Sequence, residues 1–465
     1  MKLNDRDLSI VVLAAGQGSR MKSPLPKVLH VIGGTPMLSH VLHTAKALKP
    51  AQIIVIYGYG GEVIQNKIND PEVTWVEQAT PQGTGDAVAK ALPFIPADHR
   101  VLILYGDVPL ITEQTLRRLQ NATASDAIGL LSVNTPSPVG LGRIVRDENN
   151  SVVRIIEERD ANDIERQIHE VNTGIFLVPA KHLVRWLPLL TNNNSQGEYY
   201  LTDIIQRAVK DNVPIVTASP SIPEEVLGVN DRSQQATLER YYQRHLADAL
   251  LRDGVWIRDP SRFDLRGRLQ AATEVMIDVN VVFEGVISLG QGCQIGPNCF
   301  LKDCDVGEGV KILANSHLEG VTIAKNSVVG PFARLRPGTV LGENTRVGNF
   351  VEIKKSVVGA GSKINHLSYI GDTQMGQDVN IGAGTITCNY DGVHKHETII
   401  EDGVHIGSDT QLIAPIRVGK GATLAAGSTV CKSVPPGQLT LTHELKQRSQ
   451  NWINSPGRPI KNSKE

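Results

Sequence analysis

Aliphatic residues and glycines recur on a six-residue repeat between positions 286 and 430. The pair Leu289-Gly290 lies six residues before Ile295-Gly296, and the same spacing joins Leu341-Gly342 to Val347-Gly348. A small or β-branched residue follows four positions after the aliphatic one at Cys293, Cys299, Ala333, Thr345, Val351, Thr385 and Ala422. A fixed period of this kind is typical of a repeat architecture.

Each six-residue unit can supply one short strand and one turn. The aliphatic side chain points inward, glycine adopts backbone conformations that other residues avoid, and the small residue fits a tight corner. Three units close a triangular coil of about eighteen residues, and stacked coils form a parallel β-helix. Aromatic residues make up only 4% of the chain, which favours a narrow prism filled by aliphatic side chains. A β-sandwich with glycine-rich turns is the alternative.

The N-terminal half has a different pattern, in which strands alternate with helices. Apolar runs at 10–13, 53–57, 101–105 and 129–133 predict buried parallel strands. Helical periods cover 38–48 and 87–92, so we expect an α/β sheet of the nucleotide-binding kind. Residues 143–158 predict a hairpin that turns at Asn149-Asn150, and an apolar stripe over 238–250 predicts a connecting helix.

Length and charge limit the classes of protein. With 465 residues the chain exceeds one ordinary domain, and we expect domains at 1–232 and 254–465 joined by a helical linker at 233–253. A net charge of −1 does not indicate binding to nucleic acid or to an acidic membrane. No apolar run approaches membrane-spanning length, and the start does not resemble a signal peptide. Because Cys293 and Cys299 occupy equivalent repeat positions, we interpret them as core residues and expect a cytoplasmic protein.

A glycine-rich turn follows the first predicted strand, in the sequence Leu13-Ala14-Ala15-Gly16-Gln17-Gly18-Ser19-Arg20-Met21. Open α/β sheets bind ligands at the carboxyl ends of their strands, where free backbone N–H groups can surround phosphate oxygens. The turn is neither a dinucleotide fingerprint nor a P-loop. Three further segments strengthen the hypothesis of a phosphate site: Pro26-Lys27, Gln82-Gly83-Thr84-Gly85 and Tyr105-Gly106-Asp107.

These motifs resemble those of the sugar-phosphate nucleotidyltransferases. The chain combines these motifs with a hexapeptide coil. Over residues 8–440 it therefore resembles the family of bacterial bifunctional N-acetylglucosamine-1-phosphate uridyltransferase/glucosamine-1-phosphate acetyltransferases. The resemblance implies an α/β Rossmann-like nucleotidyltransferase domain, a connecting helix and a left-handed β-helix. It implies acetylation of glucosamine 1-phosphate, then uridylyl transfer that gives UDP-N-acetylglucosamine and pyrophosphate for peptidoglycan and lipopolysaccharide. Its implied substrates are UTP, acetyl-CoA and the two sugar phosphates.

Attack of a sugar phosphate on UTP must overcome repulsion between two anions, so the site needs cations. Arg20 and Lys27 are candidates to neutralise phosphates, and Asp107 at a strand end is either a Mg²⁺ ligand or a turn cap. The resemblance implies that Asn230 is the second Mg²⁺ ligand. It also implies nucleotide and sugar contacts at Leu13, Ala14, Ala15, Gly16, Gln78, Gly83, Thr84, Tyr105, Gly106, Gly142, Glu157 and Asn172.

Acetyl transfer to an amine needs a proton acceptor and a stabilised oxyanion, and histidine is suited to the first task. His366 lies between the glycines of two coils, and the resemblance implies that it is the general base. The resemblance also implies acceptor contacts at Arg336, Lys354, Tyr369 and Asn380. We interpret Arg334 and Lys355 as solvated surface residues.

Residues 388–397 break the repeat and predict a loop that leaves the coil, a common place for function. The resemblance implies a homotrimer in which this loop reaches a neighbouring subunit. It implies coenzyme A contacts at Ala383, Asn389, Tyr390, Lys395, Ser408 and Ala426, and at His443, where relatives carry an arginine. Two alternatives stay open: a zinc cluster of His366, His394, His396 and His405, or a single-activity pyrophosphorylase whose β-helix only oligomerises.

Overall fold

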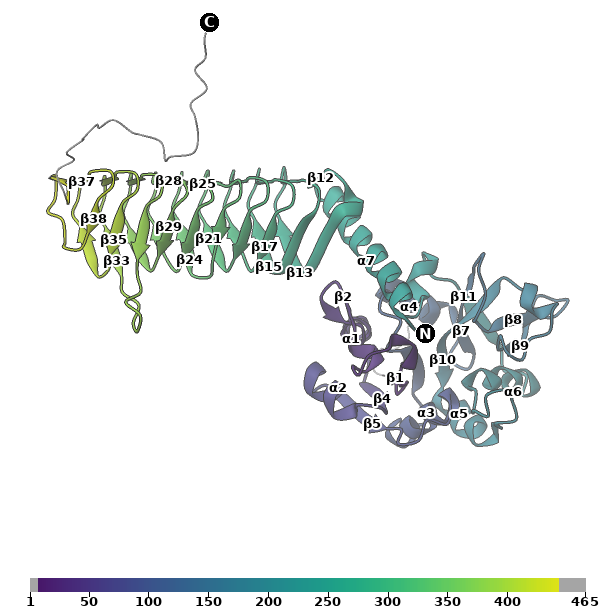
Figure 1. The fold of residues 1–465 in the computed structure, drawn as a ribbon. Helices are drawn as coiled ribbons and strands as arrows, with labels where there is room; N and C mark the ends of the chain where they lie inside the picture. The colour runs from purple at the N-terminus through teal and green to yellow at the C-terminus, as the bar shows by residue number, and fades with distance from the viewer. Residues whose placement is uncertain (1–6, 443–465) are drawn as a thin grey trace, which may run out of the picture. The chain divides into compact units, whose positions relative to one another are not determined.

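The computed structural model describes residues 7–442 and divides into two compact units (Figure 1). The first unit consists of Met1–Asp253 with Asp259–Arg268 and Val282–Gly285, and the second contains the rest of the chain from Gly254 onward. Within the described part of the chain, no helix combines the length and apolar character needed to cross a bilayer. His443 lies outside the described residues.

The first unit is built on a mixed sheet whose central path runs β11-β7-β10-β6-β1-β4-β5. The bounds are β1 Leu8–Ala14, β4 Gln52–Tyr57, β5 Val73–Glu77, β6 Arg100–Tyr105, β7 Ile128–Asn134, β10 Glu170–Pro179 and β11 Ile215–Ala218. The four strands expected from apolar runs are confirmed as β1, β4, β6 and β7. The sequence pattern missed β10, which lies between β6 and β7 and is antiparallel to both.

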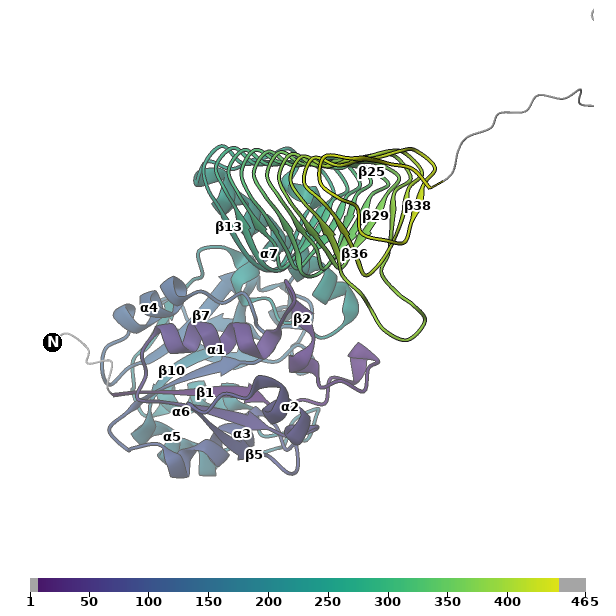
Figure 2. The ribbon, with the colours of Figure 1, turned by 90° about the vertical axis from the view of Figure 1, so that its left-hand side faces the viewer.

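Helices bury both faces of this sheet. Helices α1 (Met37–Ala47), α2 (Gly61–Ile68) and α4 (Glu113–Ala122) contribute to one apolar cluster, and α3 (Thr84–Ala91), α5 (Ala180–Trp186) and α6 (Ile204–Lys210) contribute to the other. Figure 2 shows α1 and α4 on one side of the sheet and α3, α5 and α6 on the opposite side. The predicted hairpin is confirmed as β8 (Arg143–Arg146) and β9 (Val152–Ile156), with Asn150 at a φ of 62°.

The connecting helix is α7, Arg232–Arg252, which begins after Asp231 caps the backbone N–H of Gln234. Its buried residues are Leu238, Gln243 and Ala247, so the buried face differs from the expected apolar stripe. Gln243 explains the difference, because its amide exchanges two hydrogen bonds of 2.8 Å with the backbone of Leu265. A polar side chain that is fully paired in this way can be buried without a net penalty.

The second unit is a parallel β-helix, which excludes the β-sandwich. One inward position stays in register through successive coils, at Ile277, Ile295, Ile312, Val329, Val347, Ile364, Ile381, Ile406 and Leu424. Each of these residues is at most 3% exposed, so the column forms a continuous apolar core. Cys293 and Cys299 are buried and unpaired, in agreement with their expected core positions. The stacked coils are seen end-on in Figure 2.

Each coil contributes three short strands, and the coils that concern function are the later ones. Their strands are β23 (Arg334–Leu335), β25 (Arg346–Asn349), β26 (Glu352–Lys354), β28 (Lys363–His366), β29 (Tyr369–Gly371), β31 (Asn380–Ile381), β32 (Ile386–Cys388), β33 (Thr398–Ile400), β34 (His405–Ile406) and β37 (Thr423–Leu424). The expected interruption is confirmed. The chain leaves the coil after β32, forms a loop that projects from the prism, and returns at β33 (Figure 1).

Candidate functional sites

A pocket of about 340 Å³ opens at the carboxyl ends of β1 and β6. Its lining includes these residues expected from the sequence: Leu13, Ala14, Ala15, Gly16, Lys27, Gln78, Gly83, Thr84, Tyr105, Asp107 and Asn230. It also includes Val28, Pro81, Ala87 and Glu198, which sequence reasoning did not single out. Segments that are far apart in the chain therefore meet at the edge where open α/β sheets bind ligands.

The glycine-rich turn has a specific structural requirement at Gly18. Its φ is 67°, and a Cβ added there would lie 2.6 Å from the Cβ of Lys27. Only glycine satisfies both conditions, because other residues are strained at this φ and would displace the lysine. The turn therefore brings the Lys27 segment against the end of β1.

Lys27 connects the two candidate magnesium ligands. Its ammonium donates to a carboxylate oxygen of Asp107 and, at 3.2 Å, to the side-chain oxygen of Asn230. The Asn230 segment is held beside Asp107, since the N–H of Val229 donates to the Asp107 carbonyl at 3.0 Å. Two oxygens of the kind that Mg²⁺ prefers thus converge on one point next to the pocket, and these residues fit the ion.

The candidate sugar contacts gather around Tyr105. The N–H of Asn172 donates to the carbonyl of Gly142 at 2.8 Å, and a Cβ on Gly142 would lie 3.3 Å from both carboxylate oxygens of Glu157. Burial raises the pKa of Glu157, and burial followed by the nearby Glu157 charge raises the pKa of Tyr105. Glu157 lines a second, polar hollow of about 280 Å³ rather than the first pocket.

Arg20 and Gly106 were also expected at the nucleotide site, but they do not line the first pocket. Arg20 is exposed and does not line the pocket. Gly106 donates its backbone N–H to the carbonyl of Leu13 at 2.9 Å, so it joins the ends of β1 and β6 and lies outside the pocket lining.

In the β-helix, four expected residues form one column. His366, Ala383, Ser408 and Ala426 each lie two positions after an inward aliphatic residue, and those aliphatic residues are paired in register. The exposed His366 ring has Nδ1 at 3.3 Å from the side-chain oxygen of Asn349, the residue below it in the same column. A proton on Nδ1 would leave Nε2 free to accept one. Asn380 is the first residue of β31 in the same sheet, in register with Lys363 and His405.

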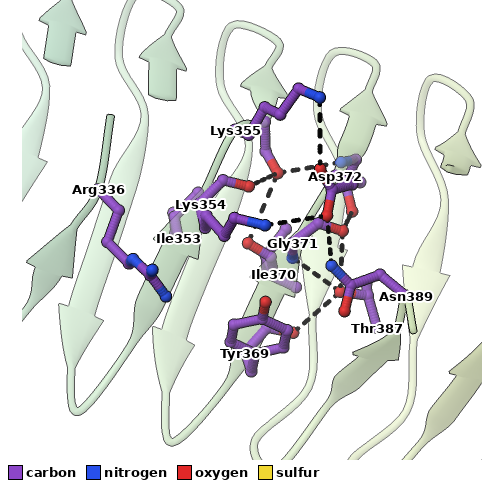
Figure 3. Close-up of polar contacts among 12 residues, drawn as sticks. Arg336, Ile353, Lys354, Lys355, Tyr369, Ile370, Gly371, Asp372, Thr387 and Asn389 are labelled. Carbon is purple, nitrogen blue, oxygen red and sulfur yellow. Dashed lines mark hydrogen bonds and ion pairs between the residues drawn. The ribbon is translucent and has the colours of Figure 1, made fainter. Parts of the chain in front are cut away.

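The expected cationic residues lie on neighbouring coils, as Figure 3 shows. Arg336 pairs with Glu352 at 2.9 Å, and Lys354 pairs with Asp372 at 3.3 Å. Tyr369 lies in register with Glu352. Strand β29 begins at Tyr369, just after the turn that carries His366, and ends at the turn of Asp372. His366 and the Lys354–Asp372 pair therefore flank opposite edges of one face of the prism.

The loop after β32 is tied to this cationic group. Asn389 is buried and donates to the Asp372 carboxylate, while Tyr390 is 59% exposed and forms a backbone bridge with Lys395. Interaction with the Lys354 ammonium lowers the pKa of Lys395.

Histidines of the loop do not build a metal centre. His396 pairs with Asp391 at 2.6 Å, and this contact holds the pKa of Asp391 well below its usual range. Across residues 7–442, the structure contains no group of three or more His, Cys, Asp or Glu side chains placed to hold a metal ion. The four histidines of the zinc hypothesis are therefore not gathered.

Sequence reasoning did not identify Asn349, Glu352 or Asp372, which contact the expected residues. Lys355, interpreted as a surface residue, is also 3.9 Å from Asp372. The repeat period contained a signal for them. Counting about one coil back from His366 and Tyr369, or on from Lys354, reaches each of these positions.

Family models match two separate parts of the chain. Residues 10–170 match the family model of the MobA-like NTP transferase domain, and residues 265–351 match the GMPPB C-terminal domain. A bifunctional protein GlmU from Azoarcus sp. is 51% identical over 454 residues, which cover 98% of this chain and 100% of that protein. The bifunctional protein GlmU of Methylococcus capsulatus is 53% identical over 456 residues, 98% of each chain.

The fold and the first pocket define a nucleotidyltransferase of Rossmann-like architecture that is continued by a left-handed parallel β-helix. Identity over nearly the whole length then fixes the family. This chain belongs to the bifunctional GlmU proteins.

Proposed function

We propose that this chain makes UDP-N-acetylglucosamine in two steps at two separate sites. The β-helix transfers an acetyl group from acetyl-CoA to glucosamine 1-phosphate, and the α/β unit transfers UMP from UTP to the product and releases pyrophosphate. The observation that carries the proposal is the convergence of the glycine-rich turn, Lys27, Asp107 and Asn230 on one pocket, in a chain whose other unit presents the His366 column. The product would serve peptidoglycan and lipopolysaccharide synthesis in the cytoplasm.

In the acetyl-transfer step, the amine of the sugar attacks the thioester carbonyl and the thiolate of coenzyme A leaves. His366 accepts the proton that the amine loses, and Asn349 orients the ring through Nδ1. Ser408, two coils further along the column, stabilises the negative oxygen of the tetrahedral intermediate. Ala383 and Ala426 leave room for the slender pantetheine arm, and Arg336 and Lys354 bind the phosphate of the acceptor.

In the uridylyl-transfer step, the chain binds two anions and holds them in line. Lys27 neutralises phosphate charge at the pocket, and Arg20 at the exposed turn binds the departing pyrophosphate. Leu13, Ala14, Ala15 and Gly16, with Gln78, Gly83 and Thr84, surround the base and ribose, while Tyr105, Gly142, Glu157 and Asn172 contact the sugar. Asp107 and Asn230 hold Mg²⁺, which when bound would neutralise the phosphates of UTP.

The chain acts as a homotrimer with acetyl-transfer sites between subunits. His366 and the Lys354–Asp372 pair flank opposite edges of one face. A neighbouring subunit that placed its Lys354–Asp372 pair next to His366 of the first subunit would complete a compact site. An exposed apolar ladder supports such a contact: Phe332, Phe350 and Leu367 are 49%, 57% and 62% exposed. The two phenylalanine rings stack with centroids 5.4 Å apart. Contiguous exposed apolar side chains mark interaction surfaces.

Two product measurements test the function. Purified chain is incubated with acetyl-CoA and glucosamine 1-phosphate, and free thiol is measured. It is then incubated with UTP, Mg²⁺ and N-acetylglucosamine 1-phosphate, and pyrophosphate is measured. We expect both products. Pyrophosphate without acetyl transfer would favour a single-activity pyrophosphorylase with a structural β-helix, and thiol release without pyrophosphate would remove the assignment of the pocket.

A further inference from the structure

Asp372 lies at the centre of the polar contacts between the coil and the projecting loop (Figure 3). Its side chain is 10% exposed, and its carboxylate accepts hydrogen bonds from Lys354 at 3.3 Å and from the side-chain amide of Asn389. The ammonium of Lys355 lies 3.9 Å away. One carboxylate therefore contacts two lysines of the preceding coil and the first residue of the loop.

The backbone of Asp372 is tied to the same segments. Its N–H donates to the carbonyl of Lys354 at 3.0 Å, and its carbonyl accepts from the N–H of Thr398 at 3.1 Å. The loop leaves the prism at Asn389 and returns at Thr398, so Asp372 contacts both ends of the loop. Side chain and backbone together link the candidate phosphate lysine to the segment that carries Tyr390 and Lys395.

The charge of Asp372 matters because several lysine side chains lie at the same edge of the prism. Lys354 and Lys355 are consecutive, and Lys395 of the loop comes close enough to Lys354 that the pKa of Lys395 is lowered. Like charges at such separations repel, and a carboxylate placed among them reduces the repulsion and fixes their direction. Two lysines contact this carboxylate and Lys395 is close to one of them, so the edge keeps a positive excess that suits a phosphate.

We propose that Asp372 is a positioning residue for acetyl transfer, which orients Lys354 toward the phosphate of the acceptor and fixes the base of the 389–397 loop. The role rests on the proposed acetyl-transfer function. Asp372 acts through Lys354 and Asn389 and does not itself contact the reacting atoms. It couples binding of the sugar phosphate to the position of the loop.

The test uses the full chain with Asp372→Asn. The φ of Asp372 is 48°, a conformation that asparagine adopts readily, so the variant keeps its backbone and loses only the charge. Asp303 provides a matched control. It occupies the corresponding turn of an earlier coil, also at a φ of 48°, and its carboxylate accepts from the N–H of Val286 at 2.9 Å. Asp303→Asn therefore carries the same substitution away from the lysine cluster.

We expect Asp372→Asn to raise the KM for glucosamine 1-phosphate by about tenfold, as for loss of one charge-assisted hydrogen bond, with a smaller change in kcat. Asp303→Asn and the uridylyl transfer of both variants should stay within about twofold of the unmodified chain. The double variant Lys354→Gln/Asp372→Asn should be little worse than Lys354→Gln alone, because the two residues act together. Amide hydrogen exchange of residues 390–397 should be faster in Asp372→Asn.

An unchanged KM, an equal effect of Asp303→Asn, or independent effects in the double variant would overturn the positioning role. The same holds for loop exchange that matches the unmodified chain. If the unmodified chain transfers no acetyl group, the proposed function fails. If it does and Asp372→Asn behaves identically, only the positioning role fails.

Discussion

Lys27 donates a hydrogen bond of 3.2 Å to Asn230, a residue 203 positions later in the chain. The same ammonium donates to Asp107, so the two oxygens that we propose as magnesium ligands also orient the lysine that we propose to neutralise phosphate. Cation and ligands are thus preorganised by one another before substrate arrives, which is the usual source of rate enhancement in phosphoryl transfer.

Replacement of Lys27 by alanine should lower the rate of pyrophosphate release by about 100-fold, the size expected for loss of one preorganised charge at a transition state. Acetyl transfer by the same protein is the internal control and should not change. Uridylyl transfer within a few fold of the unmodified rate would show that Lys27 only holds Asp107 and Asn230 in position and does not neutralise phosphate charge.

Gly18→Ala should impair uridylyl transfer through Lys27. The added Cβ would lie 2.6 Å from the Cβ of Lys27, and the φ of 67° adds about 1 kcal/mol of strain. Gly403→Ala is the control, because Gly403 has a φ of 64° and a Cβ there would meet nothing within 4 Å. We expect similar losses of thermal stability from both changes but loss of pyrophosphate release, about tenfold, only from Gly18→Ala. Equal activities would contradict the close approach of the turn to Lys27.

Shared acetyl-transfer sites predict complementation between inactive chains. Subunits with His366→Ala and subunits with Lys395→Ala should each be impaired in acetyl transfer, whereas mixed trimers formed by unfolding and refolding them together should recover part of the activity. The reason is that some interfaces would then combine an intact histidine with an intact lysine. Verified mixed trimers without recovery would mean that each chain completes its own site.

The apolar ladder predicts a change in oligomeric state. Asn298 and Asn315 have φ values of 57° and 60°, close to 55° and 56° at Phe332 and Phe350, so Phe332→Asn/Phe350→Asn suits the backbone. We expect this double variant to stay folded by circular dichroism but to dissociate in light scattering. Val357→Thr, at a residue 41% exposed, is the control and should leave the assembly intact. A double variant that remains a trimer would place the interface elsewhere.

Much of the fold could be predicted from the sequence because its period is local. The six-residue repeat specifies which side chains point inward, and the column of Ile364, Ile381 and Ile406 follows from it directly. The loop at 388–397 was predicted for the same reason, since its residues do not fit a coil. Strand β10 was missed because its place between β6 and β7 depends on tertiary pairing.

The contacts within the sites could be predicted only in part. The glycine-rich turn predicted a phosphate site at the end of β1, but nothing local to Lys27 indicates that its ammonium reaches Asn230. In the sequence, Asp372 cannot be distinguished from any other aspartate in a turn. Only the stacked coils show that it contacts Lys354 and Asn389. A residue that acts through another residue is identified by its contacts in space, and a single sequence does not provide these contacts.

The central claim is that two independent sites on one chain perform two reactions, and reciprocal variants test it most directly. Thiol release and pyrophosphate release are measured side by side for His366→Ala and for Asp107→Ala. We predict that His366→Ala loses acetyl transfer by about 100-fold or more and keeps uridylyl transfer, and that Asp107→Ala does the reverse. Loss of both reactions in either correctly folded variant, or of neither, would contradict the account.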